Sequence, residues 1–378
     1  MNILVNTTNL SAGGGLQVAD SFCSTLNRYE QHNFVVVLSS YLHSTKEKIK
    51  HYSNVEVFEY DIKNNIQTIV FGRDRFLDSL VRDKKTDAVV TIFGPSRWNP
   101  KNVFHLSGFA MSQLMLKESP FFSIIPLKEK LKWKFGNFVR KYLFARSTKV
   151  FFSENQLISD RVEQLFKNSK CYTITNYYNQ VFEEIEASSN KLNLAFNLLK
   201  RRSDEIVLLN ISTPYLFKNL PIAIDIAKEL KNKHKDLNFR FVFTCKESDF
   251  PPIEKELKDC FCFLGKVAFE ECPNLYKQCD IVFHPTLLEC FSAVYPEAMK
   301  MQKPIVTTDL PFAHSLCGDA ALYYSPLSAQ DAAEKIYTLS QSVELQKDLI
   351  QKGERQLEKY DTYIQRSEKI IKVLESYV

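Results

Sequence analysis

The sequence predicts an α/β protein of two consecutive doubly wound domains, each built on a parallel sheet. Short β-branched or aromatic runs alternate with amphipathic stretches through all 378 residues. This alternation is typical of parallel strands joined by right-handed helical crossovers. It pauses once, between Asn176 and Ser189, where no clear period is visible. We therefore expect one domain at 1–180 and a second at 190–358.

The expected strands are short runs rich in Val, Ile, Phe and Tyr. In the first domain they lie at residues 2–6, 34–38, 55–58, 88–92, 103–106, 150–153 and 171–175. In the second domain they lie at residues 206–211, 239–243, 260–264, 281–284, 304–307 and 320–324. Residues 360–378 carry apolar positions at helical spacing, so we expect a final helix that packs back on the first domain.

Composition indicates a globular protein of a reducing compartment. Hydrophobic residues make up 45% of the chain and charged residues 25%. The nine cysteines are dispersed without a CxxC spacing, which argues against a disulfide framework and against a zinc site. No signal peptide is visible, and no window approaches the roughly 18 apolar residues of a spanning helix. The sequence thus predicts a cytoplasmic protein.

A run of glycines, Gly13, Gly14 and Gly15, lies between the first strand and a helix expected near Leu16. Glycines in this position let backbone N–H groups approach a phosphate or a sugar hydroxyl. The run is not a dinucleotide fingerprint, because the sixth position counted from Gly13 is Val18. The alternative is a tight turn without a ligand.

Two glutamates lie in the segment 284–300, directly after the buried strand at 281–284. Ligands of open α/β sheets bind at the carboxyl ends of strands, where this segment begins. Because Pro296 interrupts the segment, we expect Glu289 on a loop and Glu297 in the first turn of a helix that begins near Pro296.

Carboxylates in this arrangement suit a polyhydroxylated ligand. Each can accept two hydroxyl hydrogen bonds, as from a ribose and a hexose. The intervening backbone amides, from Phe291 to Ala293, could contact a diphosphate. The alternative is a pair of solvated helix glutamates without a ligand.

The same segment resembles the donor-binding signature of retaining glycosyltransferase family 4, which has the GT-B fold. That signature reads approximately P-S-x-x-E-G-F-G-x-x-x-x-E-A-M. The matching residues are Pro285, Thr286, Glu289, Phe291, Glu297, Ala298 and Met299. The resemblance is strong over about 205–325 and weaker in the first domain. It implies two Rossmann-like domains that face each other across a cleft, and transfer of a sugar from a nucleotide-diphosphate donor to an acceptor hydroxyl.

The resemblance also implies roles for individual residues. Glu297 would bind the ribose hydroxyls, Glu289 a hydroxyl of the donor sugar, and Lys218 the diphosphate. Three residues of the loop would lie along the diphosphate and sugar: Phe291, Ser292 and Ala293. Two residues that follow an earlier strand, Gly265 and Lys266, would face the base. This sequence departs from the signature at both of its glycines, which are replaced by Cys290 and Ser292.

The catalytic residues implied are His105, Glu289 and Lys218. We expect His105 at the end of a first-domain strand, where it resembles the family's active-site histidine; the alternative is a histidine hydrogen-bonded at a strand end. The sequence contains no Asp-x-Asp, so no metal is expected, and the nucleotide sugar is a co-substrate rather than a cofactor.

The segment 127–146 is basic and aromatic, with seven basic residues against one acid, Glu129. An apolar stripe at helical spacing runs through it: Leu127, Leu131, Phe135, Phe138 and Tyr142. This composition is typical of an interfacial helix on anionic lipid. The residues expected at the membrane surface are Lys128, Lys130, Lys132, Trp133, Lys134, Arg140 and Lys141. The alternative is a surface helix whose stripe packs on its own domain.

Charge of this kind can also indicate nucleic-acid binding, but no RNA- or DNA-binding module accompanies it here. Recruitment to the inner face of the cell membrane would favour a lipid-linked glycan acceptor, as in bacterial-type surface polysaccharide synthesis. Two other functions remain open from the sequence. One is a sugar-nucleotide epimerase, which needs no acceptor. The other is a weakly catalytic nucleotide-sugar-binding subunit, which the altered glycines allow.

Overall fold

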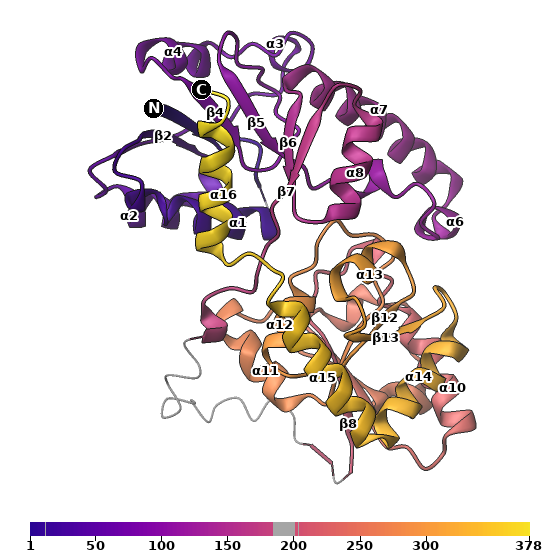
Figure 1. The fold of residues 1–378 in the computed structure, drawn as a ribbon. Helices are drawn as coiled ribbons and strands as arrows, with labels where there is room; N and C mark the ends of the chain where they lie inside the picture. Colours follow the sequence, from indigo (N-terminus) through magenta and orange to yellow (C-terminus); the bar gives the residue numbers. More distant parts are fainter. Residues whose placement is uncertain (12, 184–200, 203) are drawn as a thin grey trace. The chain divides into compact units, whose positions relative to one another are not determined.

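The computed structural model describes residues 1–11, 13–183, 201–202 and 204–378. The chain forms two compact units (Figure 1). The first comprises Met1–Lys117, Ile125–Asn176 and Asp361–Val378, and the second comprises Glu118–Ile124 and Tyr177–Tyr360. After the short segment Glu118–Ile124, the chain thus enters the second unit again at Tyr177. The later part of the expected linker, 184–189, lies outside the described residues. The sequence did not indicate that Glu118–Ile124 belongs to the second unit.

The first unit is built on a seven-stranded parallel sheet of order β3-β2-β1-β4-β5-β6-β7. The strand order reverses between β1 and β4, which is the switch point of a doubly wound sheet. The strands are β1 (Asn2–Asn6), β2 (Asn33–Leu38), β3 (Val55–Glu59), β4 (Ala88–Thr91), β5 (Phe104–Gly108), β6 (Val150–Ser153) and β7 (Lys170–Thr173).

Helices cover both faces of this sheet. They are α1 (Gly14–Cys23), α2 (His43–Ile49), α3 (Ile66–Ile69), α4 (Arg75–Asp83), α5 (Ser112–Met115), α7 (Leu127–Ser147), α8 (Gln156–Leu165) and α16 (Tyr363–Glu375). Several begin at polar caps that satisfy free backbone N–H groups. For example, the Asp74 carboxylate accepts hydrogen bonds from the amides of Phe76 and Leu77 at the start of α4.

The second unit is built on a six-stranded parallel sheet of order β10-β9-β8-β11-β12-β13, with its switch point between β8 and β11. The strands are β8 (Ile206–Asn210), β9 (Phe239–Phe243), β10 (Phe261–Phe263), β11 (Ile281–His284), β12 (Ile305–Thr308) and β13 (Ala321–Tyr324). The helices are α6 (Phe121–Ile124), α10 (Ile222–Lys233), α11 (Cys272–Gln278), α12 (Val294–Lys300), α13 (Pro311–Cys317), α14 (Ala329–Gln341) and α15 (Val343–Leu357).

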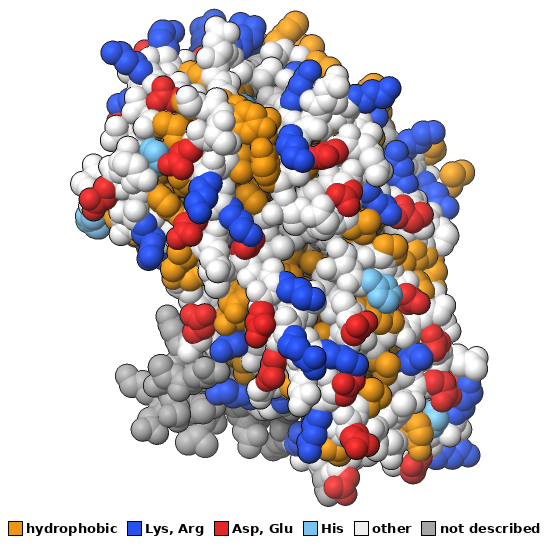
Figure 2. Space-filling model, viewed as in Figure 1, with side chains coloured by type: hydrophobic (Ala, Val, Ile, Leu, Met, Phe, Trp, Pro, Cys, Tyr) orange, Lys and Arg blue, Asp and Glu red, His pale blue; other side chains and the backbone are white. Residues whose placement is uncertain are grey.

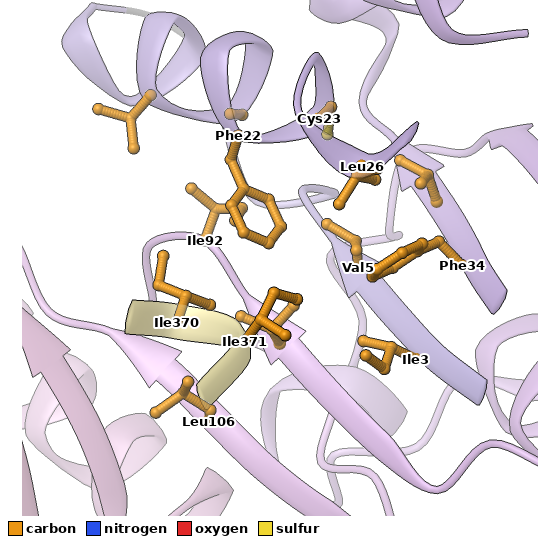
Figure 3. Close-up of a cluster of buried hydrophobic side chains, with 14 of the residues drawn as sticks. Ile3, Val5, Phe22, Cys23, Leu26, Phe34, Ile92, Leu106, Ile370 and Ile371 are labelled. Carbon is orange, nitrogen blue, oxygen red and sulfur yellow. The ribbon is translucent and has the colours of Figure 1, made fainter. Parts of the chain in front are cut away.

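The chain returns to the first unit in α16, which lies beside α1 (Figure 1). Ile370 and Ile371 of α16 enter the same buried cluster as Ile3 and Val5 of β1 and Phe22 of α1 (Figure 3). Each of these side chains is at most 2% exposed. Burial of one such side chain stabilises the fold by about 1.5–3 kcal/mol, so α16 is part of the core of the first unit.

A buried polar cluster also ties α16 to α1 and to the residues that follow β7. The guanidinium of Arg366 donates hydrogen bonds to Asn176 Oδ1 and to Ser21 Oγ, and Arg366 is 1% exposed. Glu154, directly after β6, is also buried. Burial raises the pKa of Glu154 to about 7, whereas the positive charge of Arg366 opposes that rise.

Candidate active site

The switch point of the second unit brings two loops together at one edge of the sheet. The first follows β8 after Asn210, and the second follows β11 after His284. Asn210 Nδ2 donates to the carbonyl oxygen of Phe283 (2.8 Å), which fixes the ends of the two strands relative to each other. In open α/β sheets, ligands bind at this position.

The two loops are joined by hydrogen bonds. The amide of Leu287 donates to the carbonyl oxygen of Phe217 over 2.8 Å. Lys218 is the last residue of a single 3₁₀ turn (Leu216–Lys218), and Asn219 ends that turn in the left-handed conformation, at φ 52°. This turn directs the Lys218 side chain toward the second loop, where its ammonium contacts Oε1 of Glu289.

The Lys218–Glu289 ion pair is almost removed from solvent. The two side chains are 13% and 11% exposed, and the hydroxyl of Thr286 lies 3.2 Å from Glu289 Oε1. Removal of one partner from a buried ion pair costs about 3–5 kcal/mol, because the other charge is left without compensation. The pair therefore presents a positioned cation and a positioned hydrogen-bond acceptor at the switch point.

His284 ends β11 beneath this loop and is fully buried. Its Nε2 lies 3.1 Å from the hydroxyl of Ser292, which occupies a signature glycine position. Burial, and secondarily the charge of Lys218, hold the pKa of His284 well below its ordinary value, so the imidazole is neutral. A glycine at position 292 would lack the hydroxyl that contacts His284 Nε2. Ser292 therefore has a structural role at this position.

Glu297 lies in the first turn of α12, as the sequence predicts, although the helix begins at Val294 rather than near Pro296. Tyr276 donates its hydroxyl hydrogen to Glu297 Oε2 over 2.8 Å. Burial raises the pKa of Glu297 to about 7, and the Tyr276 hydrogen bond opposes that rise. Sequence reasoning did not assign a role to Tyr276. Its position within 205–325, the part of the chain over which the resemblance is strong, was the available signal.

Other predicted donor residues lie around this loop. Phe291 is half-buried with its ring against Tyr360, and Ala293 immediately precedes α12. Gly265 and Lys266 follow β10, which is separated from β8 by β9. Gly265 has φ +70°, and a Cβ there would meet no atom within 4 Å, while Lys266 is exposed. The backbone at Gly265 therefore faces open space at the carboxyl edge of the sheet.

The glycine run of the first unit lies at the corresponding edge, after β1. The helix begins at Gly14, two residues before the expected Leu16, and Gly13 precedes it with φ 70°. A Cβ at Gly13 or at Gly14 would meet nothing within 4 Å, whereas one at Gly15 would lie 3.2 Å from Leu10. The first two glycines thus leave their backbone accessible.

Buried polar groups lie behind this run, at the switch point between β1 and β4. Asn6 Nδ2 donates to the hydroxyl of Thr91 over 3.2 Å, and Asn6 Oδ1 accepts from the amide and hydroxyl of Thr8. Sequence reasoning missed both Asn6 and Thr91, because their pairing depends on strand order.

The expectation that His105 ends its strand is wrong. It is the second residue of β5 and is 6% exposed. Its Nδ1 donates to the carbonyl oxygen of Ser147 (2.8 Å), and its Nε2 lies 2.9 Å from the hydroxyl of Thr91. Burial lowers its pKa to about 4, so the ring is neutral. Because both ring nitrogens have partners inside the first unit, the geometry favours a structural histidine over a catalytic one.

The basic aromatic segment is one 21-residue helix, α7, which Gly136 does not interrupt. Its apolar stripe is largely exposed, which argues against the interpretation that the stripe packs on its own domain. The exposed fractions are 73% for Leu127, 59% for Leu131, 72% for Phe135, 72% for Phe138 and 46% for Tyr142. Lys128, Lys132, Lys134 and Lys141 of the same helix are exposed, whereas Lys130, Trp133 and Arg140 are half-buried. Among the described residues, no helix has the length and apolar character needed to cross a membrane.

Comparison with known proteins places this geometry in context. Residues 195–356 match the model of the family Glycosyl transferases group 1. Over 180 residues the chain is 25% identical to the O-antigen chain mannosyltransferase RfbU of Salmonella typhimurium. That match covers 45% of this chain and 49% of RfbU, so it spans about half the length of the curated relative.

Solved structures match over the whole chain. The glycosyltransferase of Rickettsia africae has a TM-score of 0.67 at 14% identity and covers 99% of this chain and 97% of its own. HepE of Anabaena, solved with UDP and glucose, has a TM-score of 0.64 at 15% identity, with both chains fully covered. WaaG, a glycosyltransferase of lipopolysaccharide biosynthesis, has a TM-score of 0.65 at 14% identity and covers 99% of both chains. The fold is therefore that of the GT-B class, two Rossmann-like α/β domains.

Proposed function

We propose that this protein is a retaining glycosyltransferase of surface-glycan synthesis. It would transfer a sugar from a nucleotide-diphosphate donor to a hydroxyl of a glycan acceptor. The observation that carries the proposal is the nearly buried Lys218–Glu289 pair at the switch point of the second unit. This pair lies inside the segment 195–356, which matches a glycosyltransferase family model. The names of RfbU and WaaG, O-antigen and lipopolysaccharide proteins, support the glycan class.

In this proposal Lys218 stabilises the leaving group. The bond between the anomeric carbon and the donor phosphate oxygen breaks, and a bond to the acceptor oxygen forms on the same face of the sugar. The acceptor proton passes to the departing phosphate. Negative charge develops on that phosphate, so a cation already positioned by Glu289 stabilises the transition state without reorganisation.

The two glutamates bind hydroxyl groups. Glu289 has its second carboxylate oxygen available for a hydroxyl of the donor sugar, since Oε1 contacts Lys218 and Thr286. Glu297 already accepts the Tyr276 hydroxyl at Oε2, so Oε1 is the atom we assign to the ribose. We also propose that no metal takes part. The described residues include no group of three or more His, Cys, Asp or Glu side chains that could hold one.

We further propose that α7 lies on the anionic inner face of the cell membrane, with the protein on the cytoplasmic side. Its exposed stripe and its exposed lysines match the chemistry of such a surface. An acceptor linked to lipid would be presented at the same surface. Recruitment of the protein to the membrane favours a lipid-linked acceptor over a free sugar.

Calorimetric titration with UDP, GDP, ADP and dTDP tests the donor site. We expect one of the four to bind, and Lys218→Met to weaken it about tenfold or more, since a hydrogen bond to a charged group contributes about 1.5–3 kcal/mol. Lys347→Met, at an exposed lysine of α15, is the matched control. Equal affinity in the Lys218 variant and the wild type would contradict the assignment. Conversion of the donor sugar in the absence of acceptor would identify an epimerase instead.

A further inference from the structure

The first unit contains a basic pocket that is separate from the candidate donor site. It has a volume of about 370 Å³. Among its lining residues, Asp78 and Arg82 come from α4, Arg73 from the residues before that helix, Lys85 from the connection to β4, and Lys101 from the residues before β5. The pocket therefore lies at the amino ends of β4 and β5, whereas the glycine run lies at the carboxyl end of β1.

Four cations line this pocket against one carboxylate, Asp78, although Arg82 Nε also donates to Oδ1 of Asp83, which lies outside the lining (3.0 Å). The carboxylate of Asp78 is already engaged, because it accepts a hydrogen bond from Trp98 Nε1 (2.8 Å) and lies 3.9 Å from Arg73. Within the described part of the chain, the ammonium groups of Lys85 and Lys101 have no carboxylate partner and no hydrogen bond. The pocket thus has a surplus of positive charge that an anionic ligand would neutralise.

A second, independent feature of the pocket is an unpaired hydroxyl. Thr86 lines the pocket and is 7% exposed. Its Oγ1 is buried and has no hydrogen-bond partner among the described residues. A buried hydroxyl without a partner costs about 1–3 kcal/mol, and such groups in native proteins call for a ligand or a water. An oxygen of a bound anion would supply the missing partner.

The surface beside the pocket is apolar and exposed. Ile66, Ile69, Val70 and Phe71 have exposed fractions of 71%, 36%, 47% and 63%. This segment leads through Gly72 directly into Arg73 of the pocket. The amide of Asn99, two residues before Lys101, donates to the carbonyl oxygen of Gly72 over 2.9 Å.

Side chains of α7 hold this apolar segment in place. The guanidinium of Arg146 donates to the carbonyl oxygens of Ile69 (2.6 Å) and Val70 (2.8 Å), and the hydroxyl of Tyr142 donates to Val70 as well (3.0 Å). In Figure 2, Lys and Arg side chains gather over the α3–α4 end of the first unit and along its α7 edge, with hydrophobic side chains among them. Apolar residues fixed beside a cationic pocket match a ligand with an acyl chain and an anionic head.

From these features we infer that the pocket binds the phosphate headgroup of an anionic phospholipid, with Ile66–Phe71 inserted among the acyl chains. Arg73, Arg82, Lys85 and Lys101 supply the charge, and Thr86 donates a hydrogen bond to a phosphate oxygen. This inference concerns lipid binding alone and does not depend on sugar transfer.

The first experiment titrates the purified protein with glycerol 1-phosphate and with inorganic phosphate, in the absence of vesicles. We expect the combined variant Arg82→Ala, Lys85→Ala, Lys101→Ala to lose at least tenfold in affinity for glycerol 1-phosphate. Thr86→Val preserves charge and size, and we expect a several-fold loss. The matched control is Lys235→Ala, Lys347→Ala, Lys372→Ala, three exposed lysines elsewhere. Wild-type affinity in both pocket variants would overturn the inference.

The second experiment separates a lipid from a free anion. Wild-type protein is sedimented with phosphatidylglycerol vesicles and with phosphatidylcholine vesicles, with and without excess inorganic phosphate. We expect Thr86→Val and the triple pocket variant to weaken binding to phosphatidylglycerol vesicles and to leave nucleotide affinity unchanged. Thr86→Val should not lower the thermal midpoint, because it removes a buried hydroxyl that has no partner among the described residues. Two results together would overturn the lipid assignment in favour of a free phosphate. Inorganic phosphate would bind as tightly as glycerol 1-phosphate, and the pocket variants would bind vesicles as the wild type does.

Discussion

Lys218 and Glu289 form an ion pair across the ends of β8 and β11, although 71 residues separate them in the sequence. The resemblance to the glycosyltransferase family assigns a role to each residue separately, but the residues next to them in the sequence do not indicate that the two side chains are in contact. The contact follows from the strand order, because β8 and β11 are neighbours at the point where the sheet reverses direction. A substitution at either position therefore changes the environment of the other.

Substitution of the two site glutamates should separate binding from turnover. We expect Glu297→Ala to weaken nucleotide binding about tenfold to a hundredfold, since it removes a buried hydrogen-bond acceptor assigned to the ribose. Glu289→Ala should mainly lower kcat, because it leaves Lys218 unpositioned. Calorimetry and steady-state kinetics measure the two effects, with Glu358→Ala at an exposed position as the control. If both variants keep wild-type affinity and rate, the site is elsewhere.

The affinity for nucleotide should depend on pH through Glu297, whose pKa burial raises to about 7. The ionised carboxylate can accept more hydroxyl hydrogen bonds than the protonated acid. We therefore expect affinity to increase as the pH rises through about 7. Calorimetric titration across this range should show a flattened profile in Glu297→Gln. Parallel profiles for the variant and the wild type would exclude Glu297 as the titrating group.

Glu154 should make the first unit less stable as pH rises. Burial raises its pKa from 4.5 to about 7, so the folded state binds the proton more tightly than the unfolded state. The resulting stabilisation is fully present below about pH 4.5 and is lost as pH rises through about 7, a change of about 3 kcal/mol.

Urea unfolding of the wild type and of Glu154→Gln at both ends of this range measures the change. The difference in unfolding free energy between the two proteins should shift in favour of the variant as pH rises. Glu344→Gln, at an exposed residue of α15, should show no such shift. The same pH dependence in the wild type and in Glu154→Gln would mean that folding does not raise the pKa of Glu154.

Replacement of Lys130, Lys132 and Lys134 by Glu should release the protein from anionic vesicles. Each basic residue near such a surface contributes about 1 kcal/mol, and reversal of charge adds repulsion. Wild-type binding should also weaken with salt, because the Debye length falls from about 10 Å at 0.1 M to about 3 Å at 1 M.

Co-sedimentation at low and high salt tests this role of α7. Nucleotide affinity should stay unchanged in the charge-reversed protein, since its substitutions lie in the first unit and the candidate donor site in the second. If the wild-type protein does not co-sediment with anionic vesicles at low salt, the proposal of a membrane-bound acceptor loses its support.

Sugar transfer should survive excess EDTA. In the proposed mechanism Lys218, and not a divalent cation, balances the charge of the leaving diphosphate. The measurement is the transfer rate before and after chelation, with a known magnesium-dependent transferase as the positive control. Complete loss of transfer that added Mg²⁺ or Mn²⁺ restores would show that the reaction requires a metal.

The sequence predicted the strands well because a buried parallel strand is a local pattern of β-branched and aromatic residues. Each observed strand lies within two residues of its expected range. Side-chain partners were not predictable in the same way. His105 contacts Thr91 and Ser147, which lie 14 and 42 residues away, so its structural role depended on the order of β4, β5 and α7.

In the candidate site and in α7, the sequence predicted the secondary structure, whereas the side-chain partners and the packing depended on the tertiary structure. Glu297 could be placed in the first turn of a helix from Pro296 alone, but its partner Tyr276 comes from α11. The apolar stripe of α7 was visible as a helical period. Whether it packs inward is decided by the neighbouring elements, and Phe135 and Phe138 are each 72% exposed.

The position of α16 has a consequence for how the protein folds during synthesis. Ile370 and Ile371 complete a core whose other members include Ile3 and Val5, so the first unit lacks part of its interior until the ribosome has made the second. Domains usually fold in the order in which they leave the ribosome. Here the unit that emerges first finishes last, with hydrophobic surface open to chaperones throughout translation of the second unit. A nonsense mutation shortly after Tyr360 would consequently damage the amino-terminal unit, while sparing the unit encoded next to it.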